Sequence, residues 1–322
     1  TVGYPQVYTG AIDVENGGYL EPPGPVQPAS EPTSYRGEFS PDGRYVAYGV
    51  WQSDGIDIVV RAVGGDDVRE FPTDRAQNVI GWTPDSRGVL LFAESGDEAW
   101  VERLDLATGE FEALNRHEGA NRPYREVQVA RDGRSMFVIE PMEGREAWQW
   151  NQDGSVELGL FELGIEDDSR RLIAPSRFEG HPHLSPDGTM LAVLEVDRTG
   201  LREGRLYTIP VAGGEPTTVL EFEGDLTMMG QGIGWRSGAQ WTADGQYLLF
   251  QHEGFLKKVP ASGGPVEELV QLPTARNGAP GRGLRLVPDG SRFVVDAGSG
   301  KGEIWMVKNL PGTRGAAVSS DR

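Results

Sequence analysis

Two histidines stand two residues apart in the stretch "GHPHLSPDG", at His181 and His183, although the chain has only four histidines. On a β-strand, residues i and i+2 project from the same face, so both imidazoles can reach one ligand. Such a pair can chelate a divalent metal ion, with a third ligand from Glu126 or Gln128. The same spacing also fits a structural or simply polar role, and the pair alone does not decide between the two.

The same stretch ends in the turn "SPDG", which is one of six related turns. Their aspartates are separated by 43, 47, 55, 57 and 45 residues, and they are Asp42, Asp85, Asp132, Asp187, Asp244 and Asp289. In the (S/T)PDG form, proline presets φ, aspartate bonds its own downstream backbone and glycine takes a positive φ. An apolar run follows each turn, and most copies contain a second hairpin signal such as "RAVGGDDVREF". This period suits four strands per repeat and predicts an all-β, six-bladed β-propeller of four-stranded antiparallel blades.

The repeat places equivalent residues in rings around the expected central channel. Positions three before each turn aspartate are all apolar, as expected of wedges between blades. Positions four and six before it are rich in polar residues, which we expect on the channel side of the innermost strands. The resulting candidate ligand-binding residues are Arg36, Glu38, Glu126, Gln128, His181, His183, Gln240 and Arg285. Because buried polar groups are costly without partners, they either satisfy one another or line a wet, ligand-binding channel.

The two ends of the chain are expected to close the ring as one domain, residues 1–322. The sixth copy has a third strand in "EIWMVKNL" at 303–310 and then no further strand signal. The segment "GGYLEPPG" at 17–24 precedes the first turn and is predicted to pair with that strand as the missing outer strand. Such closure by N- and C-terminal strands removes an open seam.

Composition excludes some classes of partner. A net charge of -19 with only four lysines argues against binding to nucleic acid or to anionic membrane surfaces. The absence of cysteine excludes disulfides, thiolate metal sites and cysteine nucleophiles. No apolar run is long enough for a membrane span, and Thr1 begins no basic-plus-apolar leader, so we expect any signal peptide to have been removed.

The (S/T)PDG turn followed by an apolar strand resembles the repeat of TolB-like (WD40-like) propellers over residues 35 to 310. Ser86 replaces the glycine in the second copy and Arg131 replaces the proline in the third. The resemblance implies a periplasmic or extracellular binding module for sensing or interaction. Its protein partner, small molecule or saccharide would lie at the channel mouth, without nucleic acid and without membrane insertion. The alternative is a stand-alone propeller enzyme, a metal-assisted lyase or hydrolase, with His181 and His183 as ligands of a divalent metal ion.

Overall fold

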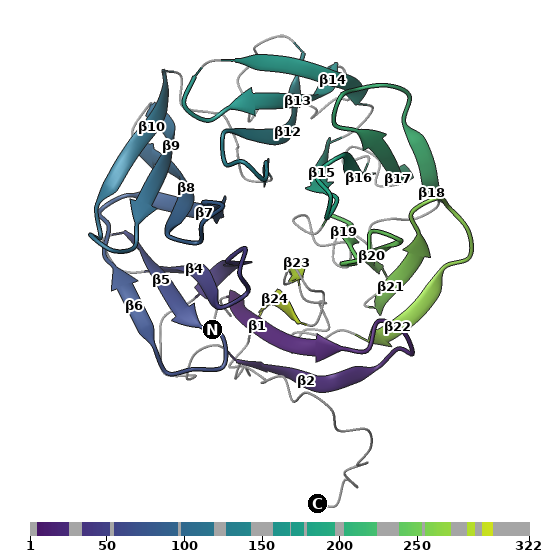
Figure 1. Ribbon diagram of the computed structural model, residues 1–322, viewed down its shortest axis with the longest axis horizontal. Helices are drawn as coiled ribbons and strands as arrows, with labels where there is room; N and C mark the ends of the chain where they lie inside the picture. Colours follow the sequence, from purple (N-terminus) through teal and green to yellow (C-terminus); the bar gives the residue numbers. More distant parts are fainter. Residues whose placement is uncertain are drawn as a thin grey trace, which may run out of the picture.

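The computed structural model describes residues 5–25, 34–51, 55–95, 98–118, 127–142, 157–167, 169–176, 179–196, 203–223, 238–252, 255–271, 282–286 and 292–298. Every regular element in these ranges is a β-strand, and the strands form six four-stranded antiparallel sheets. The sheets are arranged as blades around a central axis (Figure 1). The predicted all-β propeller is therefore confirmed. Among the described residues, no helix is long and apolar enough to cross a membrane.

The first three blades each take four consecutive strands. Blade 1 consists of β3 (Ser34–Phe39), β4 (Tyr45–Trp51), β5 (Ile56–Ala62) and β6 (Val68–Phe71). Blade 2 consists of β7 (Ala76–Trp82), β8 (Gly88–Ser95), β9 (Glu98–Asp105) and β10 (Phe111–Glu118). Blade 3 consists of β11 (Gln128–Val129), β12 (Ser135–Pro141), β13 (Leu158–Gly164) and β14 (Arg170–Ser176).

Blades 4 and 5 follow the same plan, whereas blade 6 combines both ends of the chain. Blade 4 consists of β15 (Glu179–Leu184), β16 (Met190–Val196), β17 (Glu203–Pro210) and β18 (Thr217–Glu223). Blade 5 consists of β19 (Gln240–Trp241), β20 (Tyr247–His252), β21 (Phe255–Pro260) and β22 (Glu267–Gln271). Blade 6 consists of β23 (Arg282–Leu286), β24 (Phe293–Gly298), β1 (Pro5–Ile12) and β2 (Tyr19–Pro25).

The turn that joins the first two strands of a blade has the predicted left-handed residue. The glycine of four turns has φ between 68° and 77°, at Gly43, Gly133, Gly188 and Gly245. Ser86 takes the same place in blade 2 with φ of 59°. The second turn therefore keeps the geometry without glycine, although a non-glycine residue is strained there. The sixth turn, around Asp289, lies outside the described residues.

The hydrophobic core lies between neighbouring blades rather than inside one sheet. Trp82, three residues before the turn aspartate of blade 2, packs with Ile58 and Val60 of blade 1. Trp241 occupies the same place in blade 5 and packs with Leu194 and Leu206 of blade 4. Trp82 and Trp241, two of the residues predicted to be wedges, thus bury apolar surface at blade interfaces.

The ring closes in blade 6, in part differently from the prediction. The outer strand β2 does come from the segment around 17–24, and its described partner is β1, which takes the third-strand position predicted for residues 303–310. Strand β1 also pairs with β24, from Pro5 opposite Gly298 to Gly10 opposite Phe293. The N-terminus therefore supplies both outer strands of the blade as one hairpin, and 303–310 lie outside the described residues. A hairpin forms locally at the Asp13–Gly18 turn, so the two strands enter the blade together.

This N-terminal hairpin is also fastened to blade 5. The Gly18 N–H donates to the Leu269 carbonyl at 2.8 Å, and the Tyr19 hydroxyl donates to the Gln271 carbonyl at 2.7 Å. Burial raises the pKa of Tyr19 to about 12, so the hydroxyl remains a donor at neutral pH. Lys258 Nζ donates to the Val14 carbonyl at 3.0 Å. Closure thus rests on a backbone ladder and on side-chain bonds to the neighbouring blade.

Candidate functional site

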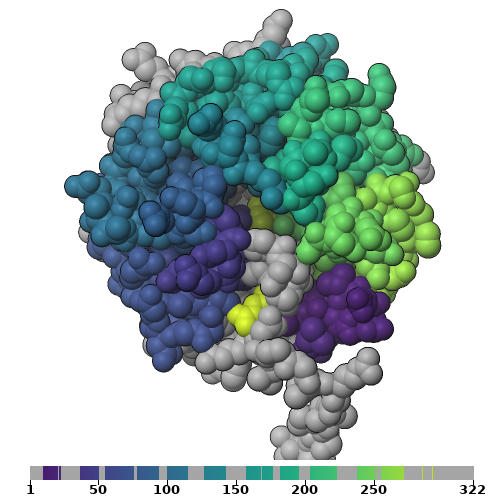
Figure 2. Space-filling view, viewed as in Figure 1, coloured from purple at the N-terminus to yellow at the C-terminus, as the bar shows by residue number. Residues whose placement is uncertain are grey.

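Two charged residues four places before their turn aspartates meet across the boundary between blades 6 and 1. Arg285 Nε donates to Glu38 Oε1 at 2.7 Å. The two side chains are 16% and 23% exposed, so solvent still reaches the pair. The innermost strands β3 and β23 hold these residues, and the space-filling view shows a hollow at the centre of the ring (Figure 2). This pair is a fixed but accessible charged group beside the central channel.

The equivalent residues of blades 4 and 5 form a second, closed pair. The Gln240 amide nitrogen lies 2.8 Å from His183 Nδ1 and 2.9 Å from Nε2. It can therefore donate to whichever ring nitrogen is unprotonated. His183 is 6% exposed and Gln240 is 8% exposed. The amide thus holds the imidazole in place and satisfies its polar edge, in line with the cost of burying unpaired polar groups.

Blades 3 and 2 complete the ring with one amide and one glycine. Gln128 donates from Nε2 to the Val129 carbonyl at 2.9 Å, and its Oε1 lies 3.5 Å from the Leu184 N–H of blade 4. At Gly81, an added Cβ would stand 2.7 Å from Val129 Cγ2. Blades 2 and 3 therefore approach too closely for a side chain at this position. The polar ring is asymmetric for that steric reason.

Tryptophan indoles fix the strands that carry both pairs. Trp82 Nε1 donates to the Glu38 carbonyl at 2.9 Å, and Trp241 Nε1 donates to the His183 carbonyl at 3.0 Å. Each bond joins one blade to the blade before it at the same repeat position. Sequence reasoning treated these tryptophans as apolar wedges only. The available signal was their occurrence in blades 2 and 5, directly after the blades that carry Glu38 and His183.

Three of the predicted site residues have side chains outside the described part of the structure. Arg36 in β3 and His181 in β15 have a described backbone but no described side chain, and Glu126 lies in 119–126, outside the described residues. The β15–β16 ladder is regular from Glu179 to Leu184, whereas the β3–β4 register shifts between Tyr35 and Glu38. The strict two-residue alternation assumed for all inner strands therefore holds in blade 4 but is broken by a bulge in blade 1.

The described residues do not assemble the donor set of a metal site. Within those ranges, no group of three or more histidine, aspartate or glutamate side chains is placed to hold an ion. His183 instead faces the Gln240 amide, which is not a group that a bound cation would favour opposite both ring nitrogens. The described residues alone therefore do not supply three ligands for a metal ion.

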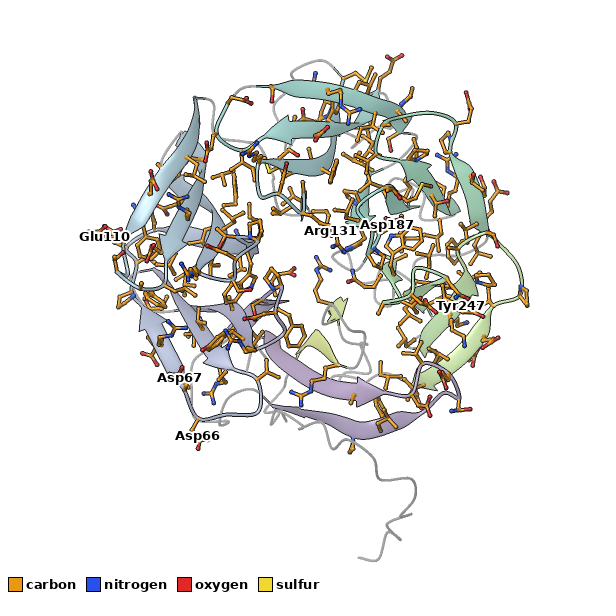
Figure 3. All side chains as sticks on the ribbon, in the orientation of Figure 1. Asp66, Asp67, Glu110, Arg131, Asp187 and Tyr247 are labelled. Carbon is orange, nitrogen blue, oxygen red and sulfur yellow. The ribbon has the colours of Figure 1, made fainter. Side chains whose placement is uncertain are left out.

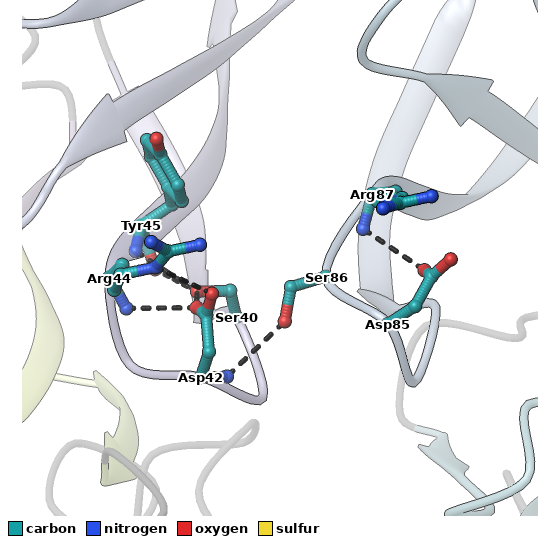
Figure 4. Close-up of polar contacts among 7 residues, drawn as sticks. All are labelled: Ser40, Asp42, Arg44, Tyr45, Asp85, Ser86 and Arg87. Atoms are coloured by element: carbon teal, nitrogen blue, oxygen red, sulfur yellow. Dashed lines mark hydrogen bonds and ion pairs between the residues drawn. The ribbon is translucent and has the colours of Figure 1, made fainter.

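The turns at the channel mouth are held by their own hydrogen bonds. In blade 1, Ser40 Oγ donates to Asp42 Oδ1 at 2.7 Å, and the Arg44 N–H donates to the same oxygen at 3.0 Å (Figure 4). In blade 4, donation from the Ser185 hydroxyl and from Thr189 lowers the pKa of Asp187 to about 2. The carboxylates of these aspartates accept hydrogen bonds from their own turns, and these bonds make the turns rigid.

Neighbouring turns also touch one another around the mouth. The Asp42 N–H donates to Ser86 Oγ at 3.2 Å, which joins blades 1 and 2 (Figure 4). An added Cβ at Gly133 would stand 2.7 Å from Pro84 Cδ, and one at Gly188 would stand 3.2 Å from Arg131 Cδ. The left-handed residue of one turn therefore packs against the turn of the preceding blade. These contacts join blades 1 to 4 in one arc.

A buried carboxylate lies behind this ring, in the second strand of blade 4. Glu195 has no exposed surface and accepts hydrogen bonds from the Ser176 hydroxyl, the Tyr207 hydroxyl at 3.0 Å and Arg205 Nη2 at 3.1 Å. Burial raises the pKa of Glu195, against the opposing effect of these three donors. Sequence reasoning treated this strand as an apolar run and missed the group. Its place at the boundary of blades 3 and 4 marks it as a structural network.

The six blades define a β-propeller whose innermost strands carry the paired polar side chains described above. No family model and no curated protein sequence matches the chain. A protein assigned as TolB in Agrobacterium tumefaciens has a similar structure, with a TM-score of 0.61 and 16% identity over 92% of this chain and 99% of that one. TolB from Acinetobacter baumannii gives a TM-score of 0.50 and 16% identity over 88% and 67%. An oligogalacturonate lyase solved in complex with manganese gives 0.54 and 13% over 92% and 98%. The chain therefore has the fold of TolB and other WD40-like propellers.

Proposed function

We propose that the protein is an extracytoplasmic binding module, a sensor or interaction propeller that takes its ligand or partner at one mouth of the channel. The observation that carries this proposal is the Glu38–Arg285 pair. It is held in one geometry by a 2.7 Å bond and yet remains partly exposed. Convergent polar groups in a concavity are the usual signature of a binding site.

The pair is suited to recognition because it offers both signs of charge. Arg285 brings a planar guanidinium with N–H donors, and Glu38 brings a carboxylate acceptor. The buried His183–Gln240 pair joins the innermost strands of blades 4 and 5 and fixes the strands on which a ligand would rest. A location outside the cytoplasm is supported by the resemblance of the repeat to TolB-like propellers.

Site-specific photocrosslinking tests the proposal. Benzoylphenylalanine in place of Gln128, beside the channel, should trap a discrete protein or small molecule in intact host cells. The same group at Glu221, exposed on the outer strand β18, should not. Mass spectrometry of the adduct distinguishes a protein from a small ligand, and fractionation checks the location. Equal trapping at both positions, or none at Gln128, would overturn the proposal.

The second candidate is a metal-assisted lyase or hydrolase acting in the channel around His181 and His183. It is supported by the occurrence of a manganese-bound oligogalacturonate lyase on this fold. Metal analysis of the purified chain tests this candidate directly. A stoichiometric ion that disappears in His183→Ala, in a variant that keeps the wild-type circular dichroism, would favour the enzyme. An ion content unchanged by the substitution would remove His183 from the candidate.

A further inference from the structure

Arginines gather at the turn end of blades 1 to 3. Arg44, Arg87 and Arg134 occupy one repeat position, two residues after the turn aspartate, where blades 4 and 5 have Thr189 and Gln246. Arg131 adds a fourth, in the place of the turn proline of blade 3. All four are exposed. We call these four residues, Arg44, Arg87, Arg131 and Arg134, the arginine arc.

The backbone of the arc is fixed from two sides. Each of the three equivalent arginines donates its N–H to the turn aspartate, at 3.0 Å for Arg44, 3.1 Å for Arg87 and 2.9 Å for Arg134. Each also accepts a bond at its carbonyl from the second hairpin of its blade, at 2.8 to 3.0 Å. Arg131 lies across the Gly188 turn of blade 4. The arc therefore presents its side chains from a rigid support.

Three of the four guanidinium groups in the arc have no hydrogen bond or ion pair to another described residue. Arg44 Nε donates to Asp42 Oδ2 at 2.8 Å. The side chains of Arg87, Arg131 and Arg134 make no hydrogen bond or ion pair in the part of the chain that the structure describes. Arg87 lies near the Asp85 carboxylate, whereas Arg131 and Arg134 have no described carboxylate partner, so these three exposed guanidinium groups can donate to a ligand. An arginine fork matches a carboxylate with two parallel bonds.

The surroundings of the arc limit what it can accept. The turn aspartates beside it already accept bonds from their own turns, so they offer few free lone pairs to a ligand. Farther out on the same end, Asp66, Asp67 and Glu110 form an acidic rim on blades 1 and 2 (Figure 3). A wide polyanion such as a membrane surface would meet this rim and be repelled. A narrow acidic chain would meet only the arc and its turn aspartates, whose carboxylates already accept bonds from their own turns.

We propose that the arginine arc docks a short acidic segment of a protein partner, with its carboxylates on Arg87, Arg131 and Arg134. This inference rests on the proposed binding function and adds the face and the chemistry of the partner. Blade 3 is the centre of the contact because it supplies two of the four arginines. The proposed docking surface ends at blades 4 and 5, which carry neutral residues at the equivalent position.

Fluorescence anisotropy with a labelled octaglutamate peptide and the full chain tests the proposal. Arg87→Gln with Arg134→Gln should weaken binding about five- to tenfold, and Arg131→Gln about two- to fivefold. The control exchanges Arg103 and Arg171 for glutamine, which removes the same charge from β9, the third strand of blade 2, and from β14, the outer strand of blade 3. This control should change binding less than twofold, and circular dichroism confirms that all variants are folded.

Three outcomes decide the matter. The proposal is supported if only the arc variants bind octaglutamate more weakly and if added salt weakens the binding of the wild-type chain. Equal weakening by the control shows a response to net charge only and overturns it. Absence of octaglutamate binding to the wild-type chain also overturns it. If crosslinking at Gln128 still traps a partner in that case, the binding function stands and only the docking surface fails.

Discussion

Replacing the buried Glu195 with glutamine tests how the blade 3–blade 4 boundary is held. The carboxylate accepts from three donors, Ser176, Tyr207 and Arg205, whereas an amide has a single acceptor oxygen and brings an NH₂ group to a site surrounded by donors. One hydrogen bond to an ionised group contributes about 1.5–3 kcal/mol. Arg205 is partly exposed and can turn to water, which keeps the loss near the lower half of that range. We expect Glu195→Gln to lower the free energy of unfolding by about 2 kcal/mol at neutral pH.

The assay is thermal and urea unfolding followed by circular dichroism. For a chain of this length, about 2 kcal/mol corresponds to a fall in Tm of about 3 °C. Glu112→Gln serves as the matched control, because Glu112 pairs with Arg103 on the surface with a side chain 60% exposed. Exposed ion pairs contribute about 0–1 kcal/mol, so this variant should shift Tm by about 1 °C or less.

A sharper test is the pH dependence of the difference in unfolding free energy between wild type and Glu195→Gln. Because burial raises the pKa of Glu195 above its ordinary value of 4.5, the folded state holds a proton there that the unfolded chain has lost at pH values between 4.5 and the raised pKa. The contribution of this group to wild-type stability is then complete below pH 4.5 and declines as pH rises through the raised pKa. The gap between wild type and Glu195→Gln should therefore narrow as pH rises. A gap that widens would mean that the Arg205 charge outweighs burial, and would refute the reasoning.

Three further predictions concern closure and the turns. Deleting residues 1–25 removes two strands of blade 6 and should abolish cooperative unfolding, or lower Tm strongly; an unchanged melting curve would contradict the closure described here. Gly43→Ala, where an added Cβ meets open space, should cost about 1 kcal/mol of stability for its left-handed backbone alone. Gly133→Ala, whose Cβ would stand 2.7 Å from the preceding turn, should cost clearly more; equal costs by urea unfolding would show that the turns do not interlock. Ser185→Ala should raise the pKa of Asp187 from about 2 toward 3.8, so that its stabilising contribution is lost at a higher pH on acidification, as NMR titration of the carboxyl would show.

The fold was predictable from the sequence because the repeated turn is local chemistry. Proline, aspartate and glycine fix the turn within four residues, and the spacing of the copies then limits the number of strands in each blade. The second turn shows that matching residue types is not sufficient, because Ser86 is not glycine and yet adopts the same left-handed φ. Closure was predicted only in part, because the strand signal of residues 5–12 is no stronger than that of 303–310. Nothing local indicates which of the two pairs with β24.

The candidate site was harder to predict because its partners belong to different blades. The alternation of apolar and polar residues identified Glu38, His183, Gln240 and Arg285 as a group. It did not indicate that they pair in twos, since that depends on how closely adjacent blades approach. The Trp82 indole bond and the Glu195 network were missed for the same reason: each joins side chains that lie on separate repeats.

The N-terminal hairpin of blade 6 has a consequence for synthesis on the ribosome. Its ladder partner β24 follows it by about 290 residues, so at about 5–20 residues per second the hairpin waits roughly 15–60 seconds for that strand. During this time one edge of β1 has no partner and is open to other chains. The outer strand β2 contains Pro22, Pro23 and Pro25, which lack the N–H groups that a foreign strand would need. The proline-rich sequence "YLEPPGP" thus protects the outer edge of the nascent hairpin. We expect chaperones to bind the unpaired edge of β1 instead.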